Sequence, residues 1–459
     1  MVDRLRENWF MRIAIVGTGR VGLVTSVSLA SLGHDVVGVD ANLETIELLQ
    51  QGRCAFFEPG LQELLEEQVA AGRIRFTGSV PDALAQAAVI FVCVGRPATP
   101  NGDRSMTAVE AVARDVARHA AQGVVVIVKS TVPPGTCERI ERTMRLERPD
   151  LRFHVVASPE FLREGHALED ALQPDRIVVG ASDARAFRLP RRVYDRALSG
   201  GCALIETDQR TAELAKLASN AFLATKISFS NGIANLCELV GADVNGVVEI
   251  MGADPRIGPS FLRAGIGYGG YCLPKDLASL RQLAARNGYT FDLLSEVARV
   301  NEEAVTRVVT KLEDLLWNLE GKRIALFGLA FKAGTDDVRS APPLALARLL
   351  IDAGAEVVGC DPMAGEAAKE ELPELRIVTD PYDAAAGVHC VVIGTEWNGF
   401  RDLDLARLRR AMAYPVIADG RNVLMPEAAR EAGFLYMGIG RPGGHADGSR
   451  PPASETVHG

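Results

Sequence analysis

A glycine-rich turn between two apolar strands sets the strongest limit on how this chain of 459 residues can fold. The run 12–16, Arg-Ile-Ala-Ile-Val, is typical of a buried strand, and Gly17-Thr-Gly-Arg-Val-Gly22 follows it directly. A helical pattern from Val24 to Leu32, a strand from His34 to Val39 and then Asp40 complete the pattern. This order predicts a dinucleotide-binding turn. Asp40 would accept ribose hydroxyls and repel a 2′-phosphate, which favours NAD over NADP.

A second segment repeats part of this pattern. The run 322–328 mirrors 11–17, and an aspartate, Asp361, again closes the next strand. The spacing from glycine to aspartate is 33 residues (361 − 328) in the second copy against 23 (40 − 17) in the first. The longer turn lacks the three-glycine pattern and carries Lys332 and Arg339, which suit a phosphorylated ligand better than a second dinucleotide.

Further apolar runs alternate with helical patterns after the first turn. Strands are expected at 89–94, 124–128, 153–157 and 176–179. This alternation predicts a parallel, doubly wound sheet, in which ligands bind at loops beyond the carboxyl ends of the strands. Three such loops carry polar and charged residues, at 95–100, 129–135 and 158–165.

The middle of the chain changes character. Residues 208–239 have few glycines and no proline, which predicts one long helix, and 291–319 predicts another. Strands at 388–393 and 416–418 extend the second sheet. We therefore expect an α/β protein of two Rossmann-like, doubly wound domains joined by a long central helix. The expected parts are an N-terminal extension (1–10), a Rossmann-like domain (11–207), a central helical region (208–320), a second Rossmann-like domain (321–440) and a disordered tail (441–459).

Composition excludes several classes of protein. The net charge of −9 argues against a large nucleic-acid surface. Eight cysteines without a Cys-x-x-Cys pair suggest neither a disulfide framework nor a metal site, and scattered thiols fit a reducing cytoplasm. No apolar stretch is long enough to span a bilayer, and residues 1–10 lack the apolar core of a signal peptide.

Cys272 is the candidate nucleophile. It follows Gly267-Tyr-Gly-Gly-Tyr271, a run that lets the backbone approach a neighbour closely. Pro274 suits the first turn of a helix, and Leu277 and Leu280 continue one at helical spacing. The thiol would then lie at the positive end of a helix dipole, where the thiolate is favoured.

These motifs together resemble the UDP-glucose/GDP-mannose dehydrogenase family. The resemblance covers about residues 11–440 and rests on GTGRVGL, EPGL, KSTVPPGT, SPEFLREG, KLASNAFLATKISFSN, DPRIGPSFL, GYGGYCLPKD and GLAFKAGTDDVRSAP, in that order. It implies oxidation of a sugar-nucleotide primary alcohol to the uronic acid with two NAD per turnover, here UDP-glucose to UDP-glucuronate. It also implies that the second Rossmann-like domain binds the UDP-sugar and that the long helix builds a homodimer.

The resemblance assigns roles to individual residues. It makes Cys272 the nucleophile that forms a thiohemiacetal and then a thioester, and Lys216 and Asn220 the donors to the oxyanion. It places Asp276, Glu164, Glu160 and Thr131 near the thiol or the hydrolytic water. The implied cofactor residues are Gly17, Gly19, Val21, Gly22, Asp40, Thr131, Glu164, Lys275 and Arg339. The implied substrate residues are Phe161, Leu162, Lys216, Asn220, Arg256, Phe261, Arg263, Gly269 and Lys332, with Arg256 reaching the substrate of a neighbouring subunit.

Each assignment has an alternative. A lone cysteine is more often buried and inert, and Lys216 on a helix is more often a solvated charge. Glu160 and Glu164 could complement a helix dipole, and Arg256 could be a turn residue. Two other functions stay open: a sister dehydrogenase acting on GDP-mannose or a UDP-N-acetylhexosamine, and a catalytically silent NAD-binding dimeric scaffold. The chain departs from the family pattern at several positions: Arg96 replaces a threonine, Gly232 a glutamate, Ala55 and Phe57 a proline and a tyrosine, and Tyr271 a serine.

Overall fold

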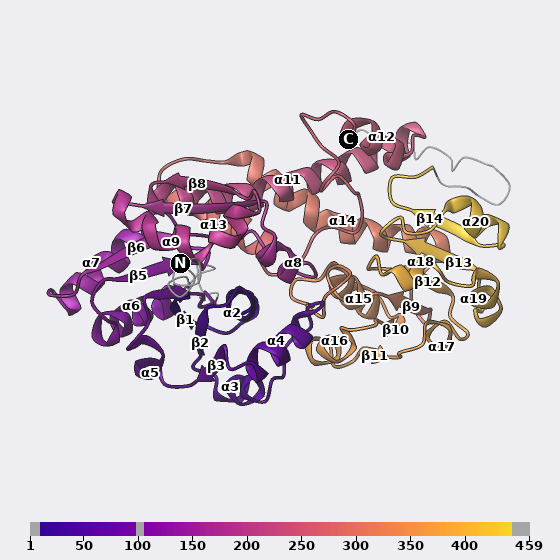
Figure 1. The fold of residues 1–459 in the computed structure, drawn as a ribbon. Coiled ribbons are helices and arrows are strands. Elements are labelled where there is room, and N and C mark those ends of the chain that lie inside the picture. The colour runs from indigo at the N-terminus through magenta and orange to yellow at the C-terminus, as the bar shows by residue number, and fades with distance from the viewer. Residues whose placement is uncertain (1–9, 98–104, 443–459) are drawn as a thin grey trace. The chain divides into compact units, whose positions relative to one another are not determined.

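Two units, which divide between Ser219 and Asn220, make up the part of the chain that the computed structural model describes, residues 10–97 and 105–442. Each unit is built around one sheet flanked by helices (Figure 1). This is the expected α/β class, with two Rossmann-like sheets and a long helix between them in the chain. The helix, α11 (Gln209–Val240), contributes residues 209–219 to the first unit and the rest to the second.

The first unit contains an eight-stranded sheet with the order β3-β2-β1-β4-β5-β6-β7-β8. Its strands are β1 (Arg12–Val16), β2 (Asp35–Val39), β3 (Ile74–Thr77), β4 (Val89–Val92), β5 (Val124–Val128), β6 (Phe153–Ala157), β7 (Arg176–Ala181) and β8 (Ala203–Thr207). Its helices are α2 (Arg20–Ser31), α3 (Leu43–Gln50), α4 (Leu61–Ala70), α5 (Val80–Leu84), α6 (Thr107–His119), α7 (Thr136–Glu147), α8 (Ala167–Leu172), the 3₁₀ turn η1 (Ala184–Phe187), α9 (Arg188–Val193) and α10 (Asp195–Ser199).

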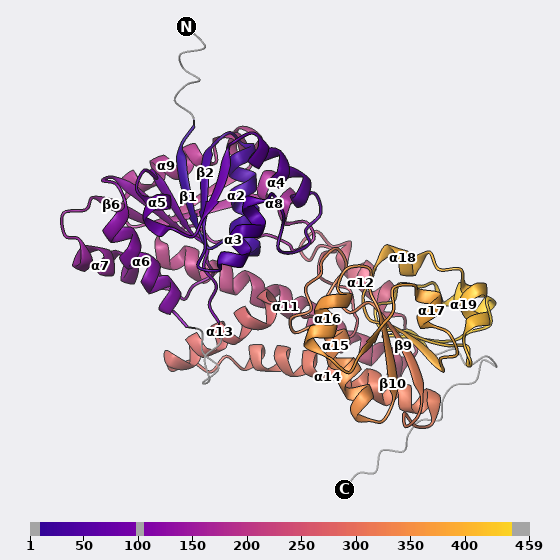
Figure 2. The same ribbon diagram turned by 90° about the horizontal axis from the view of Figure 1, so that it is seen from below.

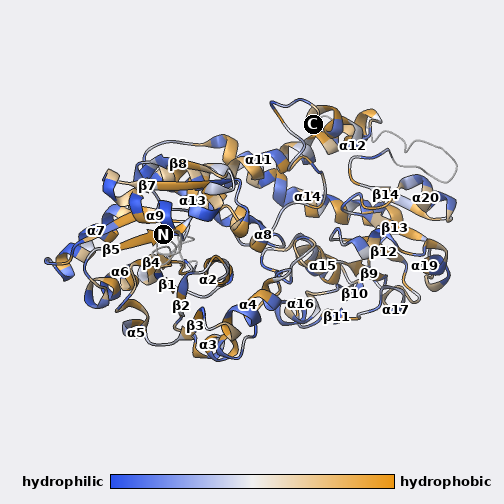
Figure 3. Cartoon of the chain, in the orientation of Figure 1, coloured by the Kyte–Doolittle hydropathy of each residue, from blue (hydrophilic) through white to orange (hydrophobic). Residues whose placement is uncertain are grey.

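Strand β1 shows why this sheet is buried on both faces. Ile13 and Ile15 belong to one apolar cluster, whereas Ala14 and Val16 belong to another. Successive side chains of a strand point to opposite faces, so helices must cover both sides. β5, for example, is the continuous apolar run Val-Val-Val-Ile-Val, which Figure 3 shows in the hydrophobic colour.

Helix α2 begins at Arg20, four residues before the start that the sequence suggested. The difference arises at Gly22, which the sequence placed in the turn and the structure places inside the helix. A Cβ atom at Gly22 would lie 1.8 Å from the Gly17 carbonyl oxygen. The glycine therefore allows the helix to start close against the turn, a role that its position in the fingerprint also predicts.

The expectation of a wholly parallel sheet is wrong at one edge. β6 and β7 pair antiparallel, and β8 runs parallel to β7. The connection from β6 to β7 holds only α8, a helix of 6 residues. In the second unit β13 (Val416–Asp419) and β14 (Leu435–Gly438) run parallel although their connection also holds a single helix of 6 residues, α20 (Pro426–Glu431), so helix length alone does not set the direction of β7.

The second unit contains a six-stranded parallel sheet with the order β11-β10-β9-β12-β13-β14, drawn in the orange and yellow of Figure 2. Its strands are β9 (Arg323–Phe327), β10 (Glu356–Cys360), β11 (Arg376–Ile377), β12 (Cys390–Ile393), β13 (Val416–Asp419) and β14 (Leu435–Gly438). Its helices, beside most of α11, are α12 (Val244–Gly252), α13 (Cys272–Arg286), α14 (Asp292–Leu316), α15 (Pro342–Asp352), α16 (Gly365–Glu371), α17 (Pro381–Ala384), α18 (Asn398–Arg401), α19 (Leu405–Ala411) and α20 (Pro426–Glu431).

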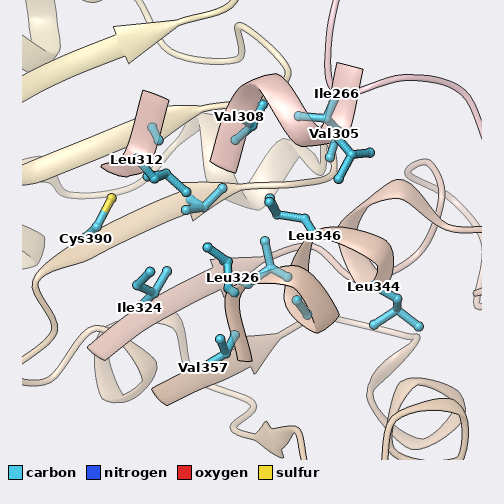
Figure 4. Close-up of a cluster of buried hydrophobic side chains, with 14 of the residues drawn as sticks. Ile266, Val305, Val308, Leu312, Ile324, Leu326, Leu344, Leu346, Val357 and Cys390 are labelled. Carbon is cyan, nitrogen blue, oxygen red and sulfur yellow. The ribbon is translucent and has the colours of Figure 1, made fainter. Parts of the chain in front are cut away.

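One apolar cluster joins this sheet to helix α14. Val305, Val308 and Leu312 of α14 lie with Leu326 of β9 in the same core (Figure 4). Ile266, from the loop that precedes Cys272, is fully buried in this cluster beside Val305. The loop that carries the candidate nucleophile is therefore anchored in the core of the second unit.

Both ends of the chain lie largely outside the described residues. Of the expected tail at 441–459, Arg441 belongs to the folded chain: its guanidinium donates to the Leu424 carbonyl at 3.0 Å and pairs with Asp243. Residues 443–459 and 1–9 lie outside the description, and the disorder expected of the tail stays a prediction. Among the described residues, none of the helices has the length and apolar character needed to cross a membrane.

Candidate active site

The turn after β1 has the geometry that a dinucleotide needs. Gly17 adopts a φ of 95°, and its N–H donates to the Val39 carbonyl at 2.8 Å. A Cβ atom at Gly19 would meet nothing within 4 Å, so the backbone is open there. Helix α2 starts at the next residue and has neither a side-chain cap nor an acid in its first turn. A helix N-terminus with free approach is an anion site.

Asp40 lies directly after β2, next to this turn. Its Oδ2 accepts from the Thr18 N–H at 2.7 Å and from the Thr18 hydroxyl at 3.2 Å, and its Oδ1 accepts from the Asn42 N–H at 3.0 Å. The side chain is only part-buried. A carboxylate has about four acceptor positions, so Asp40 retains capacity for a ribose hydroxyl.

A buried ion pair lies near the carboxyl end of β6. Lys216 of α11 and Glu160 are 3% and 5% exposed, and their charged atoms are 3.2 Å apart. Burial pushes the pKa of Glu160 upward, but the Lys216 ammonium and the Leu162 N–H outweigh it and hold that pKa below its ordinary value. The Lys216 ammonium also lies 5.3 Å from the Phe161 ring centroid. Lys216 is therefore buried and paired, and the solvated alternative does not hold.

Thr131 is held by a residue that sequence reasoning did not assign to the site. Arg96, in the loop after β4, is 4% exposed and donates to the Thr131 carbonyl at 2.9 Å. Glu213 of α11 accepts from the N–H groups of Gly135 and Cys137, which fixes the end of the same loop. In the sequence, only the departure from the family pattern at position 96 pointed to Arg96, and nothing pointed to Glu213.

The loop 158–166 also has an outside support. The buried carboxylate of Glu58 accepts from the N–H groups of Gly165 at 2.9 Å and Ala167 at 2.7 Å. Glu58 belongs to the EPGL motif, so its motif membership was a usable signal. Glu164 lies within this loop and is part-buried. The first unit thus gathers Thr131, Glu160, Phe161, Leu162, Glu164 and Lys216 on loops at the carboxyl ends of β5 and β6 and on α11.

In the second unit, Cys272 is the first residue of α13, as the sequence predicted. One turn later, Asp276 is 1% exposed and accepts from the Asn220 amide at 2.6 Å. The Lys275 ammonium lies 3.0 Å from the other Asp276 oxygen. Both carboxylate oxygens are therefore engaged, one by α11 and one by α13 itself.

Tyr271 organises two cations beside the start of α13. The Lys275 ammonium lies 4.9 Å from the Tyr271 ring centroid, and the Arg339 guanidinium carbon lies 4.5 Å from it. Cations near an aromatic ring at these distances are attracted to it. Arg339 also forms a two-point pair with Asp337. The two implied cofactor cations therefore share one ring.

Other predicted substrate residues are spread over the second unit. Arg256 is exposed and pairs with Asp254 at 2.6 Å, two residues earlier in the chain. Phe261 has a φ of 64°, Arg263 is exposed and Lys332 is part-buried. Gly269 packs so closely that a Cβ atom would lie 2.2 Å from the Ser340 carbonyl oxygen.

Three family models match the chain in order. Residues 11–198 match the NAD binding domain of the UDP-glucose/GDP-mannose dehydrogenase family, residues 210–303 its central domain and residues 325–426 its UDP binding domain. The chain belongs to this family. It is an NAD-dependent oxidoreductase, and the open backbone at Gly19, the uncapped start of α2 and the acceptor capacity of Asp40 fit that cofactor.

Members of the family resemble the chain over nearly its whole length. A UDP-glucose 6-dehydrogenase of Rhizobium meliloti is 43% identical over 94% of the chain and all of its own length, and one of Pseudomonas aeruginosa is 40% identical over 96% of the chain. The solved structure of a UDP-glucose dehydrogenase from Pyrobaculum islandicum has a TM-score of 0.88 at 40% identity and covers 94% of this chain and 98% of its own. A UDP-D-ManNAc dehydrogenase from Pyrococcus horikoshii has a TM-score of 0.83 at 29% identity, covering 94% of this chain and 99% of its own.

Proposed function

We propose that the chain oxidises UDP-glucose to UDP-glucuronate in two NAD-dependent steps. The observation that carries the proposal is the start of α13, where Cys272 opens the helix and Asp276 on its next turn is bonded to Asn220. The relatives named UDP-glucose 6-dehydrogenase support the choice of sugar nucleotide, since they are more similar to the chain than the UDP-D-ManNAc dehydrogenase is.

The chemistry balances as two hydride removals and one hydrolysis. In the first step, the C6 alcohol loses a proton and a hydride and becomes an aldehyde. The Cys272 thiolate then adds to the aldehyde carbon, and the thiohemiacetal loses a proton and a second hydride to leave a thioester. Water cleaves the thioester to the carboxylate and returns the thiol. NAD, when bound, supplies the acceptor for each hydride.

The other residues have supporting roles in this proposal. Lys216 and Asn220 lie one turn apart on the buried face of α11 and are proposed to hold the oxyanion that develops on C6. Asp276 orients the Asn220 amide through the 2.6 Å bond. Thr131, Glu160 and Glu164 are proposed to orient the hydrolytic water or its partners.

Cofactor and substrate binding are assigned in the same way. We propose that Gly17, Gly19, Val21, Gly22 and Asp40 hold the NAD dinucleotide, with Thr131, Glu164, Lys275 and Arg339 completing its contacts. We propose that Phe161, Leu162, Arg256, Phe261, Arg263, Gly269 and Lys332 contact the sugar nucleotide. In this proposal residues 11–207 bind the cofactor and residues 321–440 bind the UDP-sugar. Residues 208–320 carry the nucleophile and form the dimer interface. The free thiols of all eight cysteines fit a cytoplasmic enzyme, which stays a prediction.

The stoichiometry of NADH formation tests the reaction. We expect two NADH per UDP-glucose and little activity with GDP-mannose or UDP-N-acetylmannosamine at equal concentration. A single NADH with release of the aldehyde would reject the thioester step. Higher activity with one of the other sugar nucleotides would favour the sister enzyme, and NAD binding without turnover on any of them would favour the silent scaffold.

Replacing the nucleophile tests the assignment of Cys272. In Cys272→Ser the hydroxyl is far less acidic than a thiol, so turnover should fall by orders of magnitude. NAD and UDP-glucose should still bind in equilibrium titrations, because the change in volume is small. Near-normal turnover to UDP-glucuronate would remove Cys272 from the mechanism.

We further propose that the enzyme is a homodimer built along α11. The stripe formed by Phe222, Phe229, Leu236 and Leu239 is exposed in the single chain. Its spacing of seven residues, with Thr225, Gly232 and Leu239 three residues after each large side chain, is the pattern of helices that pair along a seam. A second copy of the same helix would cover this stripe.

A charge in this stripe tests the dimer. Phe229→Asp should shift the mass measured by light scattering toward that of one 49.2 kDa chain. Leu146→Asp, at an exposed apolar residue of α7 in the first unit, is the control for an added charge. An unchanged mass in Phe229→Asp would place the subunit interface elsewhere. If Arg256 reaches a neighbouring subunit, Arg256→Ala should weaken UDP-glucose binding more than NAD binding.

A further inference from the structure

Three consecutive residues of the loop before Cys272 form hydrogen bonds with other elements of the second unit. Gly265 donates its N–H to the Asn231 side chain at 2.8 Å, and the next residue, Ile266, donates to the Gly420 carbonyl at 3.0 Å. The Gly267 carbonyl accepts from the Arg421 guanidinium at 2.9 Å. These ties come from α11 and from the turn after β13, so several elements of the second unit fix the loop.

Asn301 of α14 provides the last tie before the nucleophile. Its side-chain oxygen accepts from the Tyr268 N–H at 2.8 Å, and its amide nitrogen donates to the Tyr268 carbonyl at 3.1 Å. Both backbone groups of one residue are thus engaged by a single side chain. The amide supplies the acceptor and the donor from two separate atoms, whereas a carboxylate can only accept and an aliphatic side chain can do neither.

The backbone between Tyr268 and Cys272 has little freedom to absorb a displacement. A Cβ atom at Gly269 would lie 2.2 Å from the Ser340 carbonyl oxygen, and one at Gly270 would lie 2.8 Å from the Phe331 ring. These contacts confine the segment from the side that faces the second sheet. A shift of Tyr268 would therefore be passed to the start of α13, where the thiol lies.

We propose that Asn301 is a positioning residue for the nucleophile: its amide fixes the Tyr268 backbone, and through the closely packed glycines it fixes the Cys272 thiol. The inference rests on the proposed function, in which this thiol attacks the C6 aldehyde. It assigns to Asn301 a part in the second oxidation and none in the first, because removal of the first hydride does not need the thiol. A misplacement of about 1 Å can cost about a hundredfold in rate.

Two variants of Asn301 and one control test this inference in the full-length enzyme. Asn301→Leu keeps the shape of the side chain and removes both bonds, whereas Asn301→Asp keeps the acceptor for the Tyr268 N–H and removes the donor. Ser228→Ala is the control, since Ser228 of α11 donates a buried bond of 2.8 Å to the Val297 carbonyl of α14. It removes a contact between two helices that both support the loop and leaves the loop's own ties intact.

Two readouts separate positioning from general destabilisation. The first is the rate of Cys272 alkylation by iodoacetamide between pH 6 and 9, followed on the tryptic peptide. The second is the partition of one turnover between aldehyde, trapped with hydroxylamine, and UDP-glucuronate. We expect Asn301→Leu to change the rate of Cys272 alkylation about tenfold or more. In one turnover it should also release aldehyde that hydroxylamine traps, while the first hydride is removed at a near-normal rate. Asn301→Asp should lie between it and the parent, and Ser228→Ala should match the parent in both readouts.

The outcomes separate this inference from the proposed function. Parent-like alkylation and no trapped aldehyde in both Asn301 variants would overturn it. Equal slowing of both oxidations, matched by Ser228→Ala, would show a structural role only and would also overturn it. If Asn301→Leu does not fold, the isosteric Asn301→Asp decides by the same two readouts. Failure of the proposed function would appear elsewhere, as normal two-step turnover in Cys272→Ser.

Discussion

Both halves of the molecule have a central strand followed by a glycine, and an aspartate at the end of the neighbouring strand, but these residues have different surroundings in the two halves. Gly17 and Gly328 both follow the central strand, have positive φ and donate to the last residue of the neighbouring strand, at 2.8 and 2.7 Å. Beyond the glycine they diverge. α2 begins three residues after Gly17, whereas α15 begins only at Pro342, after a long loop. The first unit has an open helix N-terminus directly after the turn, and the second has a loop that carries Lys332 and Arg339.

The two acids show the same divergence. Asp40 accepts from Thr18 and Asn42 and is part-buried. Asp361 is 5% exposed, and its oxygens accept from the N–H groups of Leu329, Ala330, Met363 and Ala364 and from the Trp397 indole. Five donors leave no acceptor capacity for a ribose. The same residue type therefore keeps acceptor capacity in the first unit, where we propose that it binds a ribose, and is an internal support in the second.

The largest expected effect separates the two acids by stability. Asp361→Ala would leave five donors without their acceptor, three of them in buried bonds, so the free energy of unfolding should fall by about 3 kcal/mol or more. Asp40→Ala, at a part-buried position, should cost about 1 kcal/mol. Urea unfolding followed by circular dichroism measures both. Equal losses would mean that the two acids have the same structural role.

The second prediction reverses the ranking for the cofactor. Asp40→Ala removes both the acceptor for a ribose hydroxyl and the charge that opposes a 2′-phosphate, so the ratio of kcat/KM for NAD over NADP should fall about tenfold or more. A variant at Asp361 that still folds should keep the ratio of the parent. An unchanged ratio in Asp40→Ala would show that Asp40 does not contact the ribose of the cofactor.

Two glycines of the first turn should respond in opposite ways. Gly19→Ala adds a methyl group into open space at an ordinary φ of −68°, so the fold should be unaffected while the KM for NAD rises severalfold. Gly17→Ala would place a Cβ atom 2.8 Å from the Cys93 carbonyl oxygen at a φ of 95°, so it should lower the unfolding temperature instead. Thermal unfolding and NAD titration of both variants check this pair. An unchanged KM in Gly19→Ala would exclude a close approach of the cofactor there.

The smallest expected effect concerns pH and again differs between the halves. The pKa of Glu160 is lowered, so its contribution to stability is present above its unfolded value near 4.5 and is lost as pH falls through the lowered value. Burial raises the pKa of Asp419, at the end of β13, so its contribution is present below about 3.8 and is lost as pH rises. In plots of the free energy of unfolding against pH, Glu160→Gln should reduce the loss of stability as pH falls. Asp419→Asn should reduce the loss of stability as pH rises. Parallel curves for both variants and the parent would contradict these assignments.

The sequence predicts much of this architecture because its signals are local. Apolar runs fix the central strands, the glycine spacing fixes the first turn, and Pro274 with its apolar neighbours fixes the start of α13 at Cys272. The antiparallel β7 was missed because connections with one 6-residue helix precede both the antiparallel β7 and the parallel β14, so the residues between two strands do not reveal the direction of the second. The family motifs include Glu160, which pairs with Lys216 in the first unit, and Asn220, which donates to Asp276 in the second.

What the sequence could not show are bonds from side chains to distant backbone. Asp40 and Asp361 each end a Val-Val-Gly-x run, and nothing in those residues reveals how many donors will surround the carboxylate. Asn301 lies 33 residues from Tyr268, and Arg421 lies 154 residues from Gly267. Such contacts depend on how elements pack and leave no pattern in either segment.

The supports of the Cys272 loop have a consequence for inheritance. Asn231, Asn301, Arg421 and the glycines they hold all lie after Ser219, in one contiguous stretch of the gene. Recombination within α11, near Ser219, would therefore carry Cys272 together with the side chains that hold its loop. The first unit, with Lys216 and Glu160, could then be exchanged without rebuilding the Cys272 loop, a modularity open to protein engineers as well as to evolution.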